Sequence, residues 1–174
     1  MKKLICLFMA LLCLTGCKEK RVFIDDLNVV PNDMMSYETM SEPSSHFLEI
    51  TMEESLRFFE EGGSGILMIS RSTCPHCLNA VPVMAEIAEK YDLTIYYVDC
   101  GKDFDTEHLN QLEQYTKDVL GKRGLMVPIV FSIINGKAVD QHIGTIAEED
   151  GLLSDEQKEQ VISIYEDLLK DWIN

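Results

Sequence analysis

Two cysteines separated by two residues are the part of this chain whose types and spacing point most directly to chemistry. Cys74 and Cys77 enclose Pro75 and His76. Residues three apart on a helix lie on the same face, so the two sulfurs can form a disulfide, and release it, with little backbone movement. The spacing therefore predicts a thiol pair that alternates between the reduced and the disulfide state.

The residues around the pair predict that Cys74 is the nucleophile. An apolar run at residues 65–70, typical of a buried strand, precedes an amphipathic helix that begins at the cysteines. Unpaired N–H groups in the first turn of a helix favour a thiolate over a thiol. Pro75 suits the first helical position, and His76 adds a group that can be cationic near neutral pH.

Other uses of such a pair need further ligands or a different environment. Structural zinc requires two more ligands, and the candidates Cys100, His108 and His142 form no second closely spaced pair. Two thiolates in an exported domain can also hold Cu(I). A purely structural disulfide is disfavoured, because so small a loop removes little entropy from the unfolded chain. Isolated histidines, His46 included, are expected to pack or to lie on the surface.

Hydrophobic periodicity predicts one α/β domain over residues 46–174, of a length that allows a single core. Strands are predicted at 46–50, 65–70, 93–98, 128–134 and 138–143, and helices at 51–61, 74–91, 104–123 and 154–172. Pro82 should bend the second helix. Asn135 and Gly136 predict a two-residue turn between the last two strands.

Three features together resemble the thioredoxin superfamily: the C-P-H-C motif, Pro82 in the same helix, and the Val127–Pro128 step before a strand. The resemblance covers about residues 46–173 and implies a thioredoxin fold, with a central mixed sheet flanked by helices. It further implies thiol–disulfide oxidoreductase activity, with Cys77 resolving what Cys74 captures. It implies a cis bond at Pro128 that presents the backbone of Val127 to a substrate segment.

Within that superfamily, C-P-H-C is similar to the active site of the disulfide-oxidising DsbA group. The short core is more similar to thioredoxin and to thioredoxin-fold accessory proteins associated with bacteriocin secretion. Two positions depart from thioredoxin: Met68 stands where a buried acid is expected, and Thr73 where tryptophan is expected. These departures argue against efficient thioredoxin-like reduction.

The first residues predict export. A short basic start precedes an apolar stretch at residues 4–14, too short to span a bilayer, and Leu14-Thr15-Gly16-Cys17 follows. The resemblance of this segment to bacterial lipoproteins implies cleavage after residue 16 and acylation of Cys17. The alternative is an ordinary signal peptide cleaved nearby. The expected location is the outer face of the bacterial cell membrane, or the outer membrane if there is one.

Export leaves few cysteines for the mature protein. Of the six, two lie in the predicted signal and Cys17 takes the lipid, which leaves Cys74, Cys77 and Cys100 in an oxidising compartment. Cys100 ends a predicted strand at the sheet edge of the pair, where it is either an auxiliary thiol or a packing residue.

Residues 17–45 lack helical or strand periodicity and predict a lipidated tether that holds the domain away from the membrane. The alternative is an N-terminal arm that packs Val22, Phe23, Ile24 and Leu27 on the domain.

The formal net charge of −15 argues against a nucleic-acid partner. The function predicted is an extracytoplasmic thiol–disulfide oxidoreductase, an oxidant or isomerase rather than a reductase. Its expected partners are exported cysteine-containing proteins, the membrane through the lipid, and a membrane redox partner for recycling. A monomer is expected, with no cofactor besides the Cys74–Cys77 disulfide. The alternative is a Cu(I) carrier or a redox-inactive binding module serving a membrane export system.

Overall fold

The structure is a computed structural model and describes residues 20–146 and 151–173. The expected signal peptide, residues 1–16, and the expected lipidation site, Cys17, lie outside the described residues. Within the described ranges, none of the helices combines the length and the apolar character needed to cross a membrane.

A mixed sheet forms the centre of the molecule. Its strand order is β1-β2-β4-β3-β5-β6; β2 and β3 run parallel to β4, whereas the remaining pairings are antiparallel. The strands are β1 Val30–Asn32, β2 Phe47–Glu49, β3 Gly65–Ser70, β4 Ile95–Asp99, β5 Ile129–Ile134 and β6 Lys137–Ile143.

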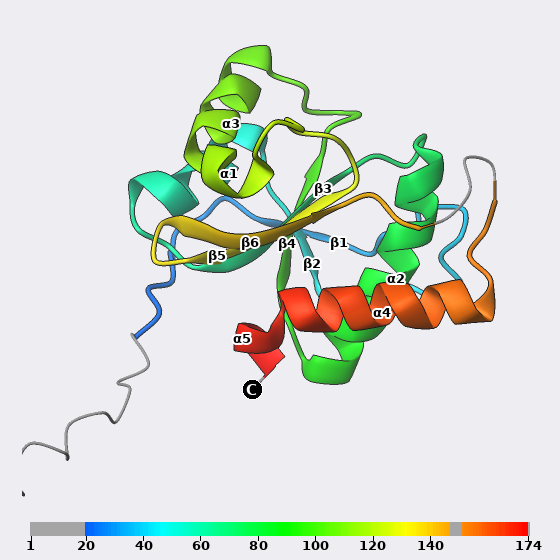
Figure 1. The fold of residues 1–174 in the computed structure, drawn as a ribbon. Helices are drawn as coiled ribbons and strands as arrows, with labels where there is room; N and C mark the ends of the chain where they lie inside the picture. The colour runs from blue at the N-terminus through cyan, green and yellow to red at the C-terminus, as the bar shows by residue number, and fades with distance from the viewer. Residues whose placement is uncertain (1–19, 147–150, 174) are drawn as a thin grey trace, which may run out of the picture.

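Helices cover both faces of this sheet, as Figure 1 shows, with α1 and α3 on one face and α2 and α4 on the other. The helices are α1 Met52–Glu60, α2 Pro75–Tyr91, α3 Thr106–Leu120, α4 Asp155–Leu168 and the short α5 Lys170–Ile173. From β2 onward, the order of elements and the sheet topology are those of the thioredoxin fold, which confirms the predicted fold class.

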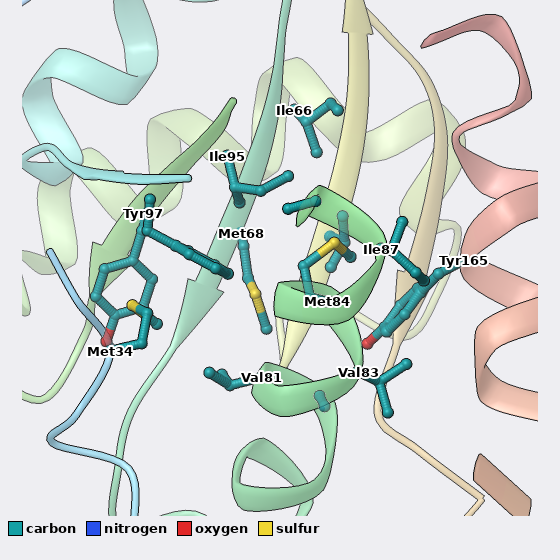
Figure 2. Packing of buried hydrophobic residues seen from close by; sticks show 14 of the residues in the cluster. Met34, Ile66, Met68, Val81, Val83, Met84, Ile87, Ile95, Tyr97 and Tyr165 are labelled. Carbon is teal, nitrogen blue, oxygen red and sulfur yellow. The ribbon is translucent and has the colours of Figure 1, made fainter. Parts of the chain in front are cut away.

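The central strand β3 is buried along its whole length, as its apolar run predicts. Side chains alternate across a strand. Ile66 and Met68 therefore pack under α2, while Leu67 and Ile69 pack under α1 and α3. Figure 2 shows Met68 between Tyr97 and helix α2. A strand between two apolar layers has little freedom to shift, so it fixes the position of the loop that follows it.

The third helix is shorter than the 104–123 predicted. The Asp105 side chain accepts the backbone N–H groups of Glu107 and His108, so the helix begins only after this cap. Gly121, with a φ of 61°, ends it at Leu120.

The C-terminal helix is broken rather than continuous through residue 172. Trp172 lies in the separate helix α5, where its indole N–H donates to the Ser132 hydroxyl at 2.9 Å.

The prediction that the N-terminal segment is a free tether is wrong for residues 20–45. β1 pairs antiparallel with β2 and becomes the edge of the sheet, because β2 would otherwise leave its own backbone groups unpaired there. Met34 and Tyr37 are buried in the core beside α2. Leu27 is buried too, as the packed-arm alternative expects, whereas Val22 and Phe23 remain exposed.

The N-terminal segment is therefore expected to contribute to stability through specific residues. Met34→Ala should lower the free energy of unfolding by about 2–5 kcal/mol, because it empties a fully buried site. Met35→Ala is the matched control; its exposed side chain predicts a change within about 0.5 kcal/mol. Urea denaturation measures both, and equal stability of the two variants would contradict the packed segment.

Candidate redox site

The cysteine pair lies where β3 leads into α2. Cys74 is the N-cap of α2, with an extended backbone, and Pro75 occupies the first helical turn, where its missing N–H removes no helical hydrogen bond. Cys77 follows in that first turn. The backbone N–H of Cys74 donates to the Arg71 carbonyl at 3.2 Å, which closes the loop between strand and helix.

The two sulfurs are adjacent but differ in exposure. Both thiols are free, and they hydrogen-bond to each other. Cys74 is 8% exposed, whereas Cys77 is wholly buried. An incoming thiol can therefore approach Cys74 and has no route to Cys77, as the sequence-based assignment of nucleophile and resolving cysteine requires.

Burial dominates the acidity of Cys77 and raises the pKa of its thiol to about 12. Hydrogen bonds from the Ser70 side chain and from the Arg71 backbone act in the opposite direction, because they stabilise the thiolate. The sulfur thus lies in a medium that disfavours charge, with a small number of donors directed at it.

The Val127–Pro128 peptide bond is cis, as the family resemblance implies. It brings the Val127 carbonyl next to the nucleophile: the Cys74 thiol donates to this oxygen, with 3.6 Å between sulfur and oxygen. Two segments far apart in the sequence therefore meet at the exposed edge of the pair.

His76 points toward the end of β6. Its Nδ1 lies 3.2 Å from the Thr145 hydroxyl, and the imidazole is half-buried. Neighbouring Asn79, which the sequence did not single out, donates to the Gly151 carbonyl at 2.9 Å and accepts the Leu153 N–H at 3.0 Å. These contacts fix the outer face of α2 beside the motif.

Cys100 lies at the end of β4, near the pair but in no disulfide. Burial raises the pKa of its thiol. It lines an apolar groove of about 180 Å³ together with Arg71, Phe104, Met126 and Val127. Phe104 and Met126 are exposed. The groove thus extends from the Val127 backbone, beside Cys74, across a surface with two accessible apolar side chains.

The isolated histidines make local contacts, as expected. His46 lies 2.9 Å from Glu89, His108 lies 3.4 Å from Asp105, and the His142 ring packs edge-on against Tyr165. In the part of the chain that the structure describes, no three histidine, cysteine or acidic side chains gather as a metal site would require. The ligands that zinc would need beside Cys74 and Cys77 are therefore not assembled among these residues.

The sequence missed the polar residues beneath Cys77. Ser70 could have been found, since alternation along β3 directs it to the same face as Met68. Tyr37, whose hydroxyl donates to Ser70 at 2.9 Å, comes from the segment interpreted as a tether and carries no local signal.

A C-x-x-C pair at the start of a helix, opposite a cis proline and on this sheet topology, defines a thioredoxin-fold protein. Solved structures similar to the chain include a putative oxidoreductase with a thioredoxin fold, at 16% identity and a TM-score of 0.47, covering 57% of this chain and 83% of that one. Thioredoxin O2 from Arabidopsis thaliana is 15% identical with a TM-score of 0.47, covering 75% and 96%. The Schistosoma mansoni thioredoxin pre-protein is 20% identical with a TM-score of 0.45, covering 74% and 100%.

The family follows from the sequence match. The model of TraF, the F plasmid transfer operon protein, matches residues 53–148, which is more than half of the chain. This protein therefore belongs to the TraF family. The search of curated proteins found no match.

The difference between the two thiols predicts selective alkylation. In the reduced native protein, iodoacetamide near neutral pH should modify Cys74 and leave Cys77 unmodified, because Cys77 is buried and stays protonated until the pH approaches about 12. Peptide mass spectrometry locates the label, and the unfolded protein, in which both react, serves as control. Equal labelling of the two cysteines in the native protein would contradict this geometry.

Proposed function

We propose that this protein is an extracytoplasmic thiol–disulfide oxidoreductase that exchanges disulfides with exported proteins through Cys74 and Cys77. The single observation that carries the proposal is the contact between two free thiols, one reachable from solvent and one sealed in the core. Such an arrangement allows one sulfur to be attacked while the other acts as leaving group or as resolving nucleophile.

In the oxidising direction, a substrate thiolate attacks the sulfur of Cys74 in the Cys74–Cys77 disulfide. The bond between the two cysteines breaks, its electron pair leaves with Cys77, and a mixed disulfide joins the substrate to Cys74. A second substrate thiolate then attacks the substrate's own sulfur in that bond and releases Cys74 as a thiolate. The substrate gains a disulfide, the cysteine pair holds the two electrons, and a membrane redox partner must remove them before the next cycle.

The Val127 backbone and the adjoining groove are suited to an extended, cysteine-containing substrate segment. The Val127 carbonyl already accepts a hydrogen bond from Cys74, so a substrate strand lying along it would bring its own sulfur to the nucleophile. Phe104 and Met126 line the groove beside it and offer apolar contact to a neighbouring substrate side chain.

Three sequence features favour an oxidant or isomerase over a reductase. His76, when protonated, stabilises the reduced thiolate at the helix start, and a more stable reduced form makes a disulfide more oxidising. Met68 and Thr73 replace the acid and the tryptophan expected of thioredoxin.

Cleavage after residue 16 and acylation of Cys17 would attach the mature chain to the outer face of the membrane. The apolar stretch and the Leu14–Cys17 motif support this location. An anchored enzyme would meet exported proteins as they emerge. It would act as a monomer without nucleic acid and would need no cofactor besides its own disulfide.

Trapping of the covalent intermediate tests the reaction. Cys77→Ser should accumulate a mixed disulfide with a cysteine-containing substrate, because the resolving thiol is gone, whereas Cys74→Ser should accumulate none. Non-reducing electrophoresis after acid quenching measures both variants. Formation of a one-to-one Cu(I) complex by the wild type, without exchange or trapping, would instead identify a metal carrier, and the absence of all three a redox-inactive binding module.

The charge of His76 tests the oxidising direction. His76→Ala should shift the glutathione equilibrium toward the enzyme disulfide by up to about fivefold, as expected for loss of about 0.2–1 kcal/mol of attraction between opposite charges near the surface. His46→Ala is the matched control, since His46 is bonded to Glu89 away from the pair. An unchanged equilibrium in His76→Ala would show that the imidazole does not act on the sulfur.

A further inference from the structure

A file of three hydroxyl groups lies beneath the buried cysteine. Ser70 from β3 hydrogen-bonds to the Cys77 thiol. The Tyr37 hydroxyl lies 2.9 Å from Ser70 Oγ and 2.9 Å from the Tyr97 hydroxyl. Ser70 is wholly buried, and each tyrosine is 1% exposed, so solvent does not compete for these bonds.

The hydrogen bonds in this file have a definite direction. A hydroxyl carries one proton. Tyr37 donates its proton to Ser70, so the bond between the two tyrosines must be donated by Tyr97. The proton of Ser70 is then free to point at Cys77, and every member of the file donates toward the sulfur.

Both tyrosines are kept in the donating form. Burial, with a smaller contribution from the negative charge of Asp99, raises the pKa of Tyr37 and of Tyr97 far above neutrality. Asp99 lies opposite Ser70 in the pairing of β3 with β4. Its carboxylate accepts from the Gly101 N–H and pairs with Lys102, so it is occupied outside the file.

The sulfur of Cys77 needs such donors at one moment of the reaction. When a substrate thiolate attacks Cys74, the electron pair of the broken S–S bond leaves on Cys77, inside an apolar core. Met68, on the same face of β3, offers no polar group there. Tyr165 also faces this core, but among the described residues its hydroxyl has no hydrogen-bond partner. Of the side chains around Cys77, Ser70 is the hydroxyl that reaches the sulfur.

We propose that Ser70 stabilises the departing Cys77 thiolate, and that Tyr37, which the N-terminal segment inserts into the core, is the positioning residue that orients the Ser70 hydroxyl. This inference rests on the proposed function and deepens it. Ser70 is a catalytic residue because it touches a reacting sulfur, and Tyr37 acts through Ser70, with Tyr97 behind it. No proton needs to be transferred: the hydroxyl donates a hydrogen bond to the charge that appears.

The position of the segment supports this role. β1 anchors it on the sheet edge, and Met34 packs beside the ring of Tyr97 (Figure 2). Tyr37 lies edge-on to Tyr97, with 6.4 Å between the ring centroids. Residues before the α/β domain thus complete the surroundings of its cysteine pair.

The rate at which reduced glutathione opens the disulfide of the full-length chain tests the inference. Ser70 donates to the thiolate as it departs, so Ser70→Ala should slow this step by about five- to tenfold, and Tyr37→Phe by about two- to fivefold. The equilibrium with glutathione at neutral pH should change by less than about twofold in both variants, because Cys77 ends the step as a neutral thiol. The double variant should be no slower than Ser70→Ala alone, because Tyr37 acts through Ser70.

Two variants control for the loss of a hydroxyl elsewhere in the sheet. Tyr96→Phe changes the neighbour of Tyr97 on the opposite face of β4, and Ser132→Ala changes a buried serine of β5 that accepts from Trp172. Both should leave the rate of disulfide opening within about twofold of the wild type, with thermal unfolding monitored to confirm that each variant is folded.

The outcomes separate this inference from the function on which it rests. A wild-type chain that never exchanges with glutathione overturns the proposed function and the inference with it. A wild type that exchanges, with Ser70→Ala and Tyr37→Phe no different from the controls, overturns the inference alone. Additive losses of rate in the double variant overturn the role of Tyr37 as a residue acting through Ser70.

Discussion

The sealed position of the Cys77 sulfur is the constraint on which the rest of the structure depends. Its burial makes the two cysteines unequal and raises the pKa of one thiol to about 12. A sulfur that is both shielded and hard to ionise does not react with solvent thiols, so the proposed exchange has to pass through Cys74. The apolar layer of β3 under α2 provides this burial, whereas Cys74, the N-cap of α2, keeps 8% of its surface exposed.

In the proposed exchange, the buried sulfur carries charge for part of the cycle and therefore needs polar groups that are themselves buried. The hydroxyls of Ser70, Tyr37 and Tyr97 satisfy one another along a single direction, so none of them is left unpaired in the core. The cost of placing polar groups among apolar side chains is thereby limited. The N-terminal segment is essential to this arrangement because Tyr37 is its central member.

The side of the pair that faces away from the core is lined by a backbone carbonyl and by exposed apolar side chains. Cys74 contacts the carbonyl of Val127, and an apolar groove with exposed Phe104 and Met126 adjoins it. The pair is thus divided into an outward-facing and a core-facing sulfur. His76, tied to Thr145 at the end of β6, links the motif to the far edge of the sheet.

The amino-acid sequence by itself determined the α/β class, the buried strand β3, the helix α2 with its cysteines, and the proline step at 127–128. These features depend on local rules: unbroken apolar runs, helical spacing, N-terminal caps and the conformational limits of proline. Two helix ends could not be distinguished from the periodicity. Helix α3 ends at Leu120 because Gly121 follows it. The C-terminal helix is interrupted at residue 169, beyond which Trp172 contacts Ser132 of the distant strand β5. Only the tertiary structure decided that residues 20–45 join the sheet and that Tyr37 reaches Ser70. The physical reason is that this segment forms one short edge strand and buries only a few side chains, so its sequence shows no hydrophobic periodicity. The residues that these groups contact lie tens of residues away in the chain.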